Sequence, residues 1–189
     1  MALSNPQIGF FPDLRSGKYD GRITACKQCS GIHCCGILEE GGNLEPPYLT
    51  KLDIAKIQYF TGLQKEKFAF QRINPITGNL IYKMRTKPNH GCIFFDYEKG
   101  TCEIFSYRPM DCRLFPLDIE FIQDTYYWAL FKYGCNISQN DLDHLLNYKD
   151  VALKILGNEL HDYATSPVPG MSRIGYQLLM KVDDSRADI

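Results

Sequence analysis

Eight cysteines carry the clearest chemistry in this sequence of 189 residues. Two of them, Cys26 and Cys29, form a CxxC, in which two intervening residues let both sulfurs converge on one ion. Such a pair is a common half of a tetrathiolate zinc or iron–sulfur site. Clustered cysteines in a reducing compartment are typical of metal or redox sites and not of structural disulfides. The sequence therefore predicts a cysteine-ligated metal centre, with all eight cysteines as candidate ligands: Cys26, Cys29, Cys34, Cys35, Cys92, Cys102, Cys112 and Cys135.

Other uses of these cysteines stay open at this point. A CxxC can be a thioredoxin-like redox pair, but that use needs a βαβ context that the stretch around Cys29 lacks. In an oxidising compartment the eight cysteines could form four disulfides. The first residues, Met1 to Pro6, have neither the basic nor the apolar region of a signal peptide. We therefore expect a cytoplasmic protein with reduced cysteines.

Cys112 is expected in the first turn of a short helix that begins near Pro109, where the helix dipole favours a thiolate. Arg108 and Arg113 lie beside it in the sequence and can offset the charge of a tetrathiolate centre. We assign both arginines to the surroundings of the cofactor, with surface salt bridges as the alternative.

The remaining cysteines fall into two groups. Cys34 and Cys35 are adjacent, and because adjacent side chains diverge, we expect one to complete the CxxC site while the other faces a second site or the core. Cys92 and Cys102 lie on either side of a predicted hairpin turn, where they can face each other across it or point to one centre. Cys135 follows Gly134, which allows a close approach of the backbone.

Soft thiolate ligands select zinc or iron–sulfur clusters, and a ligand set of sulfur alone does not separate the two. Zinc modules more often pair two CxxC knuckles, whereas this chain has cysteines scattered over several segments with arginines beside them. We therefore expect a 4Fe–4S cluster, with zinc as the alternative. Its predicted ligands are Cys26, Cys29, Cys112 and one of Cys34 or Cys35, and the other cysteines form a second site or line the first.

The elements that position these cysteines are predicted to form a small α+β fold. Thr50 is a good N-cap for a helix that stops at Thr61-Gly62. A second long helix is expected from about Ser138 to Tyr163, bent or broken at Gly157, and a last short helix over 171–181. Between them we expect a small antiparallel sheet of four to six strands, with flanking helices, held together by the metal centre. The predicted strand pairs are 68–73 with 80–84, 92–96 with 101–105, and 117–123 with 125–131.

Composition limits the partners. The 21 Lys and Arg against 22 Asp and Glu give a net charge of −1, so no basic field is available for a nucleic acid or an anionic membrane. No apolar run approaches the roughly 18–20 residues of a membrane span. We expect an N-terminal arm (1–22), a cysteine-cluster domain (23–137) and a C-terminal helical extension packed on it (138–189).

The order of the cysteines resembles that of the CxxCxxxxCC family of zinc- or iron-chelating domains, over about residues 26–136. The resemblance includes Leu49-Thr50-x2-Asp53-Ile54 and the string Arg108-Pro109-x2-Cys112-Arg113-x-Phe115-Pro116. Asn136-Ile137 departs from the Pro-Gly that often follows the last cysteine in relatives.

Similar domains occur in flagellin lysine N-methylases, which use S-adenosylmethionine. The resemblance therefore leaves three functions open. The first is a metal-binding protein with a structural or electron-transfer centre. The second is a SAM-dependent protein lysine N-methylase or a component of one, although no SAM-binding glycine loop follows a clear strand here. The third is a metal-held interaction module that binds a protein partner.

Overall fold

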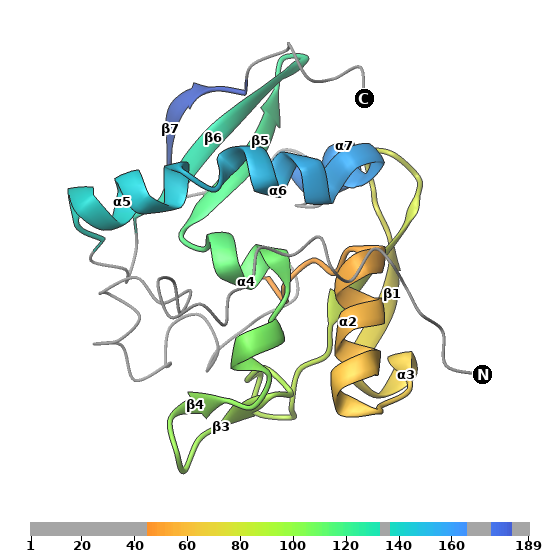
Figure 1. Ribbon diagram of the computed structural model, residues 1–189. Helices are drawn as coiled ribbons and strands as arrows, with labels where there is room; N and C mark the ends of the chain where they lie inside the picture. Colours follow the sequence, from red (N-terminus) through yellow and green to blue (C-terminus); the bar gives the residue numbers. More distant parts are fainter. Residues whose placement is uncertain (1–44, 133–136, 166–174, 183–189) are drawn as a thin grey trace.

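The structure, a computed structural model, describes residues 45–132, 137–165 and 175–182. These residues form helices and antiparallel strands in a mixed α+β fold, which confirms the predicted fold class (Figure 1). The helices are α2 (Lys51–Thr61), α3 (Lys65–Phe68), α4 (Met110–Leu114), α5 (Gln139–Leu146), α6 (Lys149–Leu156) and α7 (Leu160–Ala164), with 3-10 turns η2 (Phe105–Tyr107) and η3 (Gly157–Glu159). The strands are β1 (Ala69–Ile73), β2 (Leu80–Met84), β3 (Phe95–Asp96), β4 (Thr101–Cys102), β5 (Leu117–Ile122), β6 (Thr125–Phe131) and β7 (Tyr176–Lys181).

The strands form three separate antiparallel sheets, β1–β2, β3–β4 and β5–β6–β7, so the prediction of one sheet of four to six strands is wrong. The pairs do not merge because other structure lies between them. Residues 85–94 make only an isolated bridge, between Thr86 and Cys92, and helix α4 separates β4 from β5. The three hairpins themselves were predicted.

Helix α2 begins and ends where its sequence indicates. The Thr50 hydroxyl accepts a hydrogen bond from the backbone N–H of Asp53, and the Asp53 carboxylate accepts one from the backbone N–H of Thr50, which completes a capping box. Gly62 ends the helix in the left-handed conformation, with φ of 70°. The predicted start and stop of this helix are confirmed.

The second strand pair is shorter than predicted. Of the ranges 92–96 and 101–105, only β3 and β4 are strands, and each has two residues. Phe95 N–H donates to the Cys92 carbonyl and Tyr107 N–H donates to the Ile104 carbonyl, so both ends of the hairpin are turns. Beyond the two short strands, one further cross-strand bond runs from Glu103 N–H to the Phe94 carbonyl, and then local i to i+3 bonds take over.

The C-terminal part differs more. Instead of one helix bent or broken at Gly157, there are α5, α6 and α7. The interruption at Gly157 was predicted, and a second break at Asn147-Tyr148 was not. Leu145 and Leu156, which lie on either side of this break, are both buried in the core. The prediction of a short helix over 171–181 is wrong, because residues of this range form β7. The unpaired edge of β6 supplies backbone partners for β7, a non-local effect that an apolar pattern does not contain.

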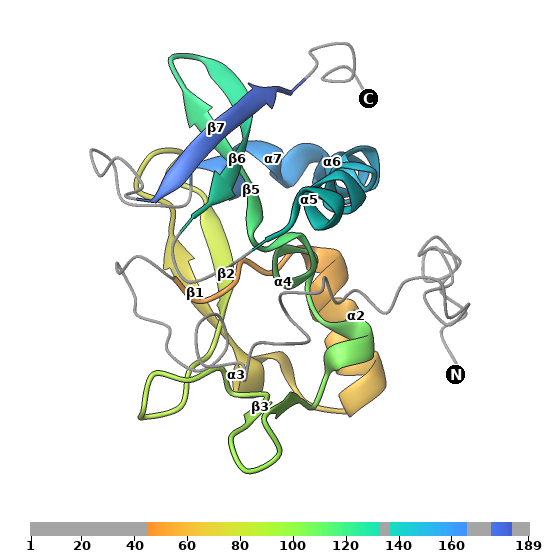
Figure 2. The ribbon, with the colours of Figure 1, turned by 90° about the vertical axis from the view of Figure 1, so that its left-hand side faces the viewer.

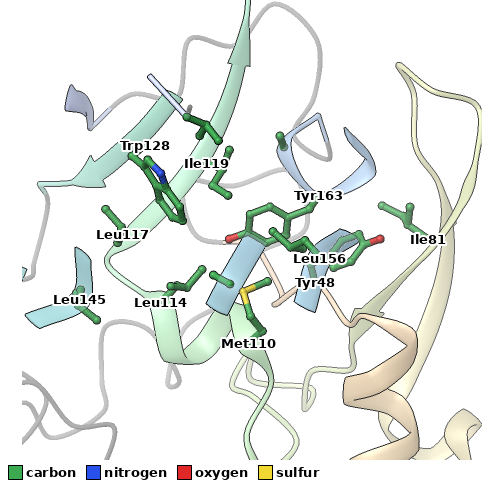
Figure 3. Packing of buried hydrophobic residues seen from close by; sticks show 13 residues of the cluster. Tyr48, Ile81, Met110, Leu114, Leu117, Ile119, Trp128, Leu145, Leu156 and Tyr163 are labelled. Carbon is green, nitrogen blue, oxygen red and sulfur yellow. The ribbon is translucent and has the colours of Figure 1, made fainter. Parts of the chain in front are cut away.

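Two apolar clusters stabilise the described residues. The first, here the β5–β6 cluster, contains Trp128 and Ile119 from the sheet and Leu145, Leu156 and Tyr163 from the helices that cover it (Figure 3). The second, here the α2 cluster, groups buried side chains of α2 and the two small hairpins. Its buried members are Leu49, Ile54, Ile57, Phe68, Ala69, Met84, Cys92, Phe94, Phe95 and Ile104.

Helix α4 lies between these two parts of the molecule. Figure 1 shows α5, α6 and α7 in front of the large sheet, and α2 beside the β1–β2 hairpin. In the turned view of Figure 2, α4 again lies between the two groups. Among the described residues, no helix combines the length and the hydropathy that a membrane crossing requires.

Candidate metal centre

Half of the predicted site residues fall in the part of the chain that the structure describes. These are Cys92, Cys102, Cys112 and the two arginines, Arg108 and Arg113. The other candidate ligands lie outside the described residues: Cys26, Cys29, Cys34, Cys35 and Cys135.

Cys92 and Cys102 are held close together by the β3–β4 hairpin. Cys102 pairs with Phe95 in the register of the two strands, and Phe95 N–H donates to the Cys92 carbonyl at 3.0 Å. Cys92 is also fixed to the chain that follows β2, through its bridge with Thr86. Cys92 is buried and Cys102 is partly buried against the α2 cluster. The hairpin therefore brings the backbone of Cys102 near that of Cys92, and both side chains belong to or pack against the α2 cluster.

Helix α4 presents its cysteine on the face away from the β5–β6 cluster. Met110 and Leu114 are four residues apart, so they share one face of the helix, and both are buried in the β5–β6 cluster. Cys112 is two residues from each, which at about 100° per residue places it on the opposite face. The helix that begins at Pro109 was predicted, and its apolar face fixes the direction of the cysteine.

The three thiols interact electrostatically. Burial raises the pKa of the Cys112 thiol well above its ordinary value, and the charges of Asp111, Cys92 and Cys102 raise this pKa further. Arg108 acts in the opposite direction and lowers it. Within the described residues, no three Cys, His, Asp or Glu side chains form a complete metal-binding group. The described thiols thus share a neighbourhood without forming a full ligand set among themselves.

The two predicted arginines flank this neighbourhood. Arg108 is 9% exposed, and its guanidinium lies 4.3 Å from the centroid of the Phe105 ring. Arg113 Nε donates to the Arg108 carbonyl at 2.9 Å and its NH2 group donates to the Ser106 carbonyl at 3.0 Å. Arg113 therefore clamps the chain on both sides of Tyr107, and its guanidinium lies against the segment just before α4.

Asp53 connects helix α2 to this region, a role that the sequence analysis did not assign. Its side chain is fully buried, and its Oδ1 accepts a hydrogen bond from the backbone N–H of Met110 at 3.1 Å. The same oxygen lies 3.5 Å from Lys56 Nζ. The carboxylate that caps α2 therefore also binds the first N–H of α4, 57 residues away.

Lys56 is a third cation near the cysteines and was not predicted. It is 6% exposed, and its Nζ donates to the Arg108 carbonyl at 3.3 Å. Burial lowers the pKa of Lys56 to about 8, with Asp53 and Cys112 raising it and Arg113 lowering it. The i, i+3 spacing of Asp53 and Lys56 on one helix is the only sequence signal that could have indicated this pair.

The described residues fit a thiolate-bound metal. Three soft sulfur donors come from three separate segments, and three cationic side chains surround the start of the helix that carries Cys112. Such a neighbourhood suits a centre with net negative charge, as a tetrathiolate zinc site or a thiolate-ligated iron–sulfur cluster is. Because metal binding requires thiolates, the raised pKa of Cys112 also means that binding releases a proton there.

Comparison with known proteins identifies one family. The family model CxxCxxCC, described as "Putative zinc- or iron-chelating domain", matches residues 25–136. The match includes all eight cysteines and both arginines. No solved structure matches the chain.

Proposed function

Since this chain belongs to the CxxCxxCC family of zinc- or iron-chelating domains, we propose that it holds an iron–sulfur centre with a structural or electron-transfer role. Zinc chelation is the alternative within the same site. The observation that carries the proposal is the grouping of Cys92, Cys102 and Cys112, which come from separate segments and share one electrostatic neighbourhood.

The charged side chains around the cysteines favour an anionic, thiolate-ligated centre over an uncharged one. Lys56 and Arg108 are both buried, and Arg113 lies beside them with its Nε on the Arg108 carbonyl. Asp53 and Asp111 supply negative charge to the same region. The cationic side chains can stabilise an anionic tetrathiolate centre.

The remaining ligands are proposed from the sequence. Cys26 and Cys29 supply the CxxC pair, Cys112 the ligand on α4, and one of Cys34 or Cys35 the fourth. Cys92, Cys102 and Cys135 then line the centre or form a second site. When bound, a 4Fe–4S cluster supplies one-electron redox chemistry, and the protein residues bind it, orient it and tune its charge.

Anaerobic purification followed by metal and sulfide analysis tests the proposal. We expect iron with inorganic sulfide and a broad visible absorbance that bleaches with dithionite. Cys112→Ser should reduce the metal content, whereas Ser106→Ala, which alters a neighbouring exposed side chain and no thiol, should not. Colourless protein with stoichiometric zinc and no sulfide would support the zinc alternative, and protein without metal would refute both.

The two other functions predict different ligands. A SAM-dependent lysine N-methylase should bind S-adenosylmethionine in a calorimetric titration. An interaction module should retain its protein partner when the metal is redox-inactive zinc. Both stay predictions, as do the absence of nucleic-acid and membrane partners, the cytoplasmic location and the three domain boundaries.

A further inference from the structure

We propose that Tyr82 is a nucleophilic phenol on the β1–β2 hairpin and a site of covalent modification, at which an activated acyl donor transfers its acyl group to the phenolic oxygen. The group lies outside the proposed metal centre, so the proposal is the same for iron and for zinc. It is based on the convergence of two hydrogen-bond donors, Lys65 Nζ and Gln71 Nε2, on that oxygen.

The strand register brings Gln71 to Tyr82. The two residues are direct partners in the antiparallel pair β1–β2, so their side chains share one face of the hairpin. Gln71 Nε2 donates to the Tyr82 oxygen at 2.7 Å. Lys65 reaches the same oxygen from helix α3, with its Nζ at 2.9 Å, and its ammonium lies 4.5 Å from the centroid of the Tyr82 ring. The phenolic oxygen therefore accepts from one charged and one neutral donor.

The hydroxyl proton of Tyr82 has no acceptor in the part of the chain that the structure describes. Lys65 and Gln71 both contact the oxygen through nitrogen atoms that carry hydrogens, and such groups donate. A phenolic oxygen can accept these bonds as a neutral phenol or as a phenolate, but only the neutral form has a proton to place. Two donors on the oxygen therefore favour the phenolate, which only accepts.

The charges around Tyr82 act in the same direction. The hydrogen bonds from Lys65 and Gln71 lower the pKa of the Tyr82 phenol, and the positive charge of Lys65 lowers it further. Desolvation and the carboxylate of Glu66 raise this pKa, but the lowering prevails. The contact with Tyr82 in turn raises the pKa of Lys65, so the ammonium stays charged where the phenol ionises.

An activated phenol of this kind reacts with an acyl donor in one balanced step. The phenolate oxygen attacks the carbonyl carbon of the donor and forms a new carbon–oxygen bond. The bond from that carbon to the leaving group breaks, and the leaving group departs with the electron pair and takes up a proton from water. The phenolic proton of Tyr82 goes to water, and the product is an aryl ester on its side chain.

Tyr59 provides a matched control within the same chain. It lies on α2 and is 68% exposed, whereas Tyr82 is partly buried. The Tyr59 ring lies 5.1 Å from that of Phe60, centroid to centroid, and among the described residues its hydroxyl has no hydrogen-bond partner. Exposure alone therefore predicts faster reaction at Tyr59, whereas activation of the phenol predicts faster reaction at Tyr82.

The experiment treats the full chain with N-acetylimidazole and follows both tyrosines by peptide mass spectrometry. Hydroxylamine removes acetyl groups from tyrosine and not from lysine, so it separates the two products. Rates are measured from about pH 7.5 to 10 for the wild type, Lys65→Met, Lys65→Arg and Lys67→Met. Lys65→Arg keeps a cationic donor without a reactive amine, and Lys67→Met removes an exposed charge from the same helix without removing a donor to Tyr82.

We expect Tyr82 to be acetylated at least about threefold faster than Tyr59 in the wild type, and its rate to rise at a lower pH. Lys65→Met should remove most of this advantage, whereas Lys65→Arg and Lys67→Met should keep it. Acetylation of Tyr82 that is no faster than that of Tyr59, or that is unchanged in Lys65→Met, would overturn the proposal. An equal fall at both tyrosines in Lys65→Met would show a general change of structure and would overturn it as well.

Discussion

Replacement of Asp53 by alanine should destabilise the protein far more than the loss of a helix cap alone. The cap itself contributes about 1 kcal/mol. The substitution also leaves the Met110 N–H without its acceptor, at about 1–3 kcal/mol, and removes the carboxylate beside a buried ammonium, at about 3–5 kcal/mol. These costs overlap, because all involve one carboxylate, so we expect a total of about 4 kcal/mol. That is a large share of the roughly 5–15 kcal/mol by which domains are stable.

Urea denaturation measures this loss of stability. An unchanged slope of the unfolding free energy against urea concentration would show that the variant exposes the same surface on unfolding as the wild type. The double variant Asp53→Ala/Lys56→Met should recover part of the loss, because it removes the ammonium that the single variant leaves without its carboxylate. Asp143→Ala, at an exposed position of α5, is the control and should change stability by less than about 0.5 kcal/mol. A loss of only about 1 kcal/mol for Asp53→Ala would refute the connection between α2 and α4 and leave Asp53 as a cap alone.

Two further predictions concern metal and pH. Removal of metal by a chelator should lower the melting temperature by at least about 10 °C, because metal–thiolate bonds offset the entropy cost of bringing distant cysteines together. Calorimetry that finds the same melting temperature for metal-free and metal-loaded protein would contradict this. Burial raises the pKa of Glu159, although Lys51 N–H and the Tyr48 hydroxyl donate to its carboxylate. An acid with a raised folded-state pKa favours folding while it is protonated, and this stabilisation is lost as the pH rises through that pKa. Glu159→Gln should therefore become progressively more stable than the wild type as the pH rises from about 4 to 7, and a difference that is constant or shrinks with pH in urea titrations would be the contrary result.

Local signals in the sequence were enough to predict the elements with strong caps and turns. Thr50 with Asp53, and Gly62, define both ends of α2 because capping depends on residues within one turn. The β5–β6 hairpin was predicted around Asp124, which with Gln123 adopts positive φ in the two-residue turn. Helix α4 was predicted from the position of Pro109, and the family from the order of the cysteines.

Features that depend on distant partners were not predictable in this way. Strand β7 forms because β6 offers an edge, and nothing within 176–181 separates that outcome from a helix. The hydrogen bond from Met110 N–H to Asp53 joins residues that no local period connects. Lys56 had the same difficulty, since its spacing from Asp53 is typical of an exposed helical ion pair, whereas the side chain is buried and contacts the distant Arg108 carbonyl.

The position of α4 explains why a metal would matter for this fold. Met110 and Leu114 attach one face of this five-residue helix to the β5–β6 cluster, while Asp53 fixes its first N–H to α2. The opposite face carries Cys112 toward the region of Cys92 and Cys102, which pack with the α2 cluster. A metal bound by Cys112 and by thiols on the other side would therefore join the two apolar clusters through a single short helix. Without metal, the clusters still meet through β2, which places Ile81 in one and Met84 in the other, and the start of α4 is held to α2 by the Asp53 carboxylate. A metal at Cys112 would add a connection on the face of α4 that carries no buried apolar residue.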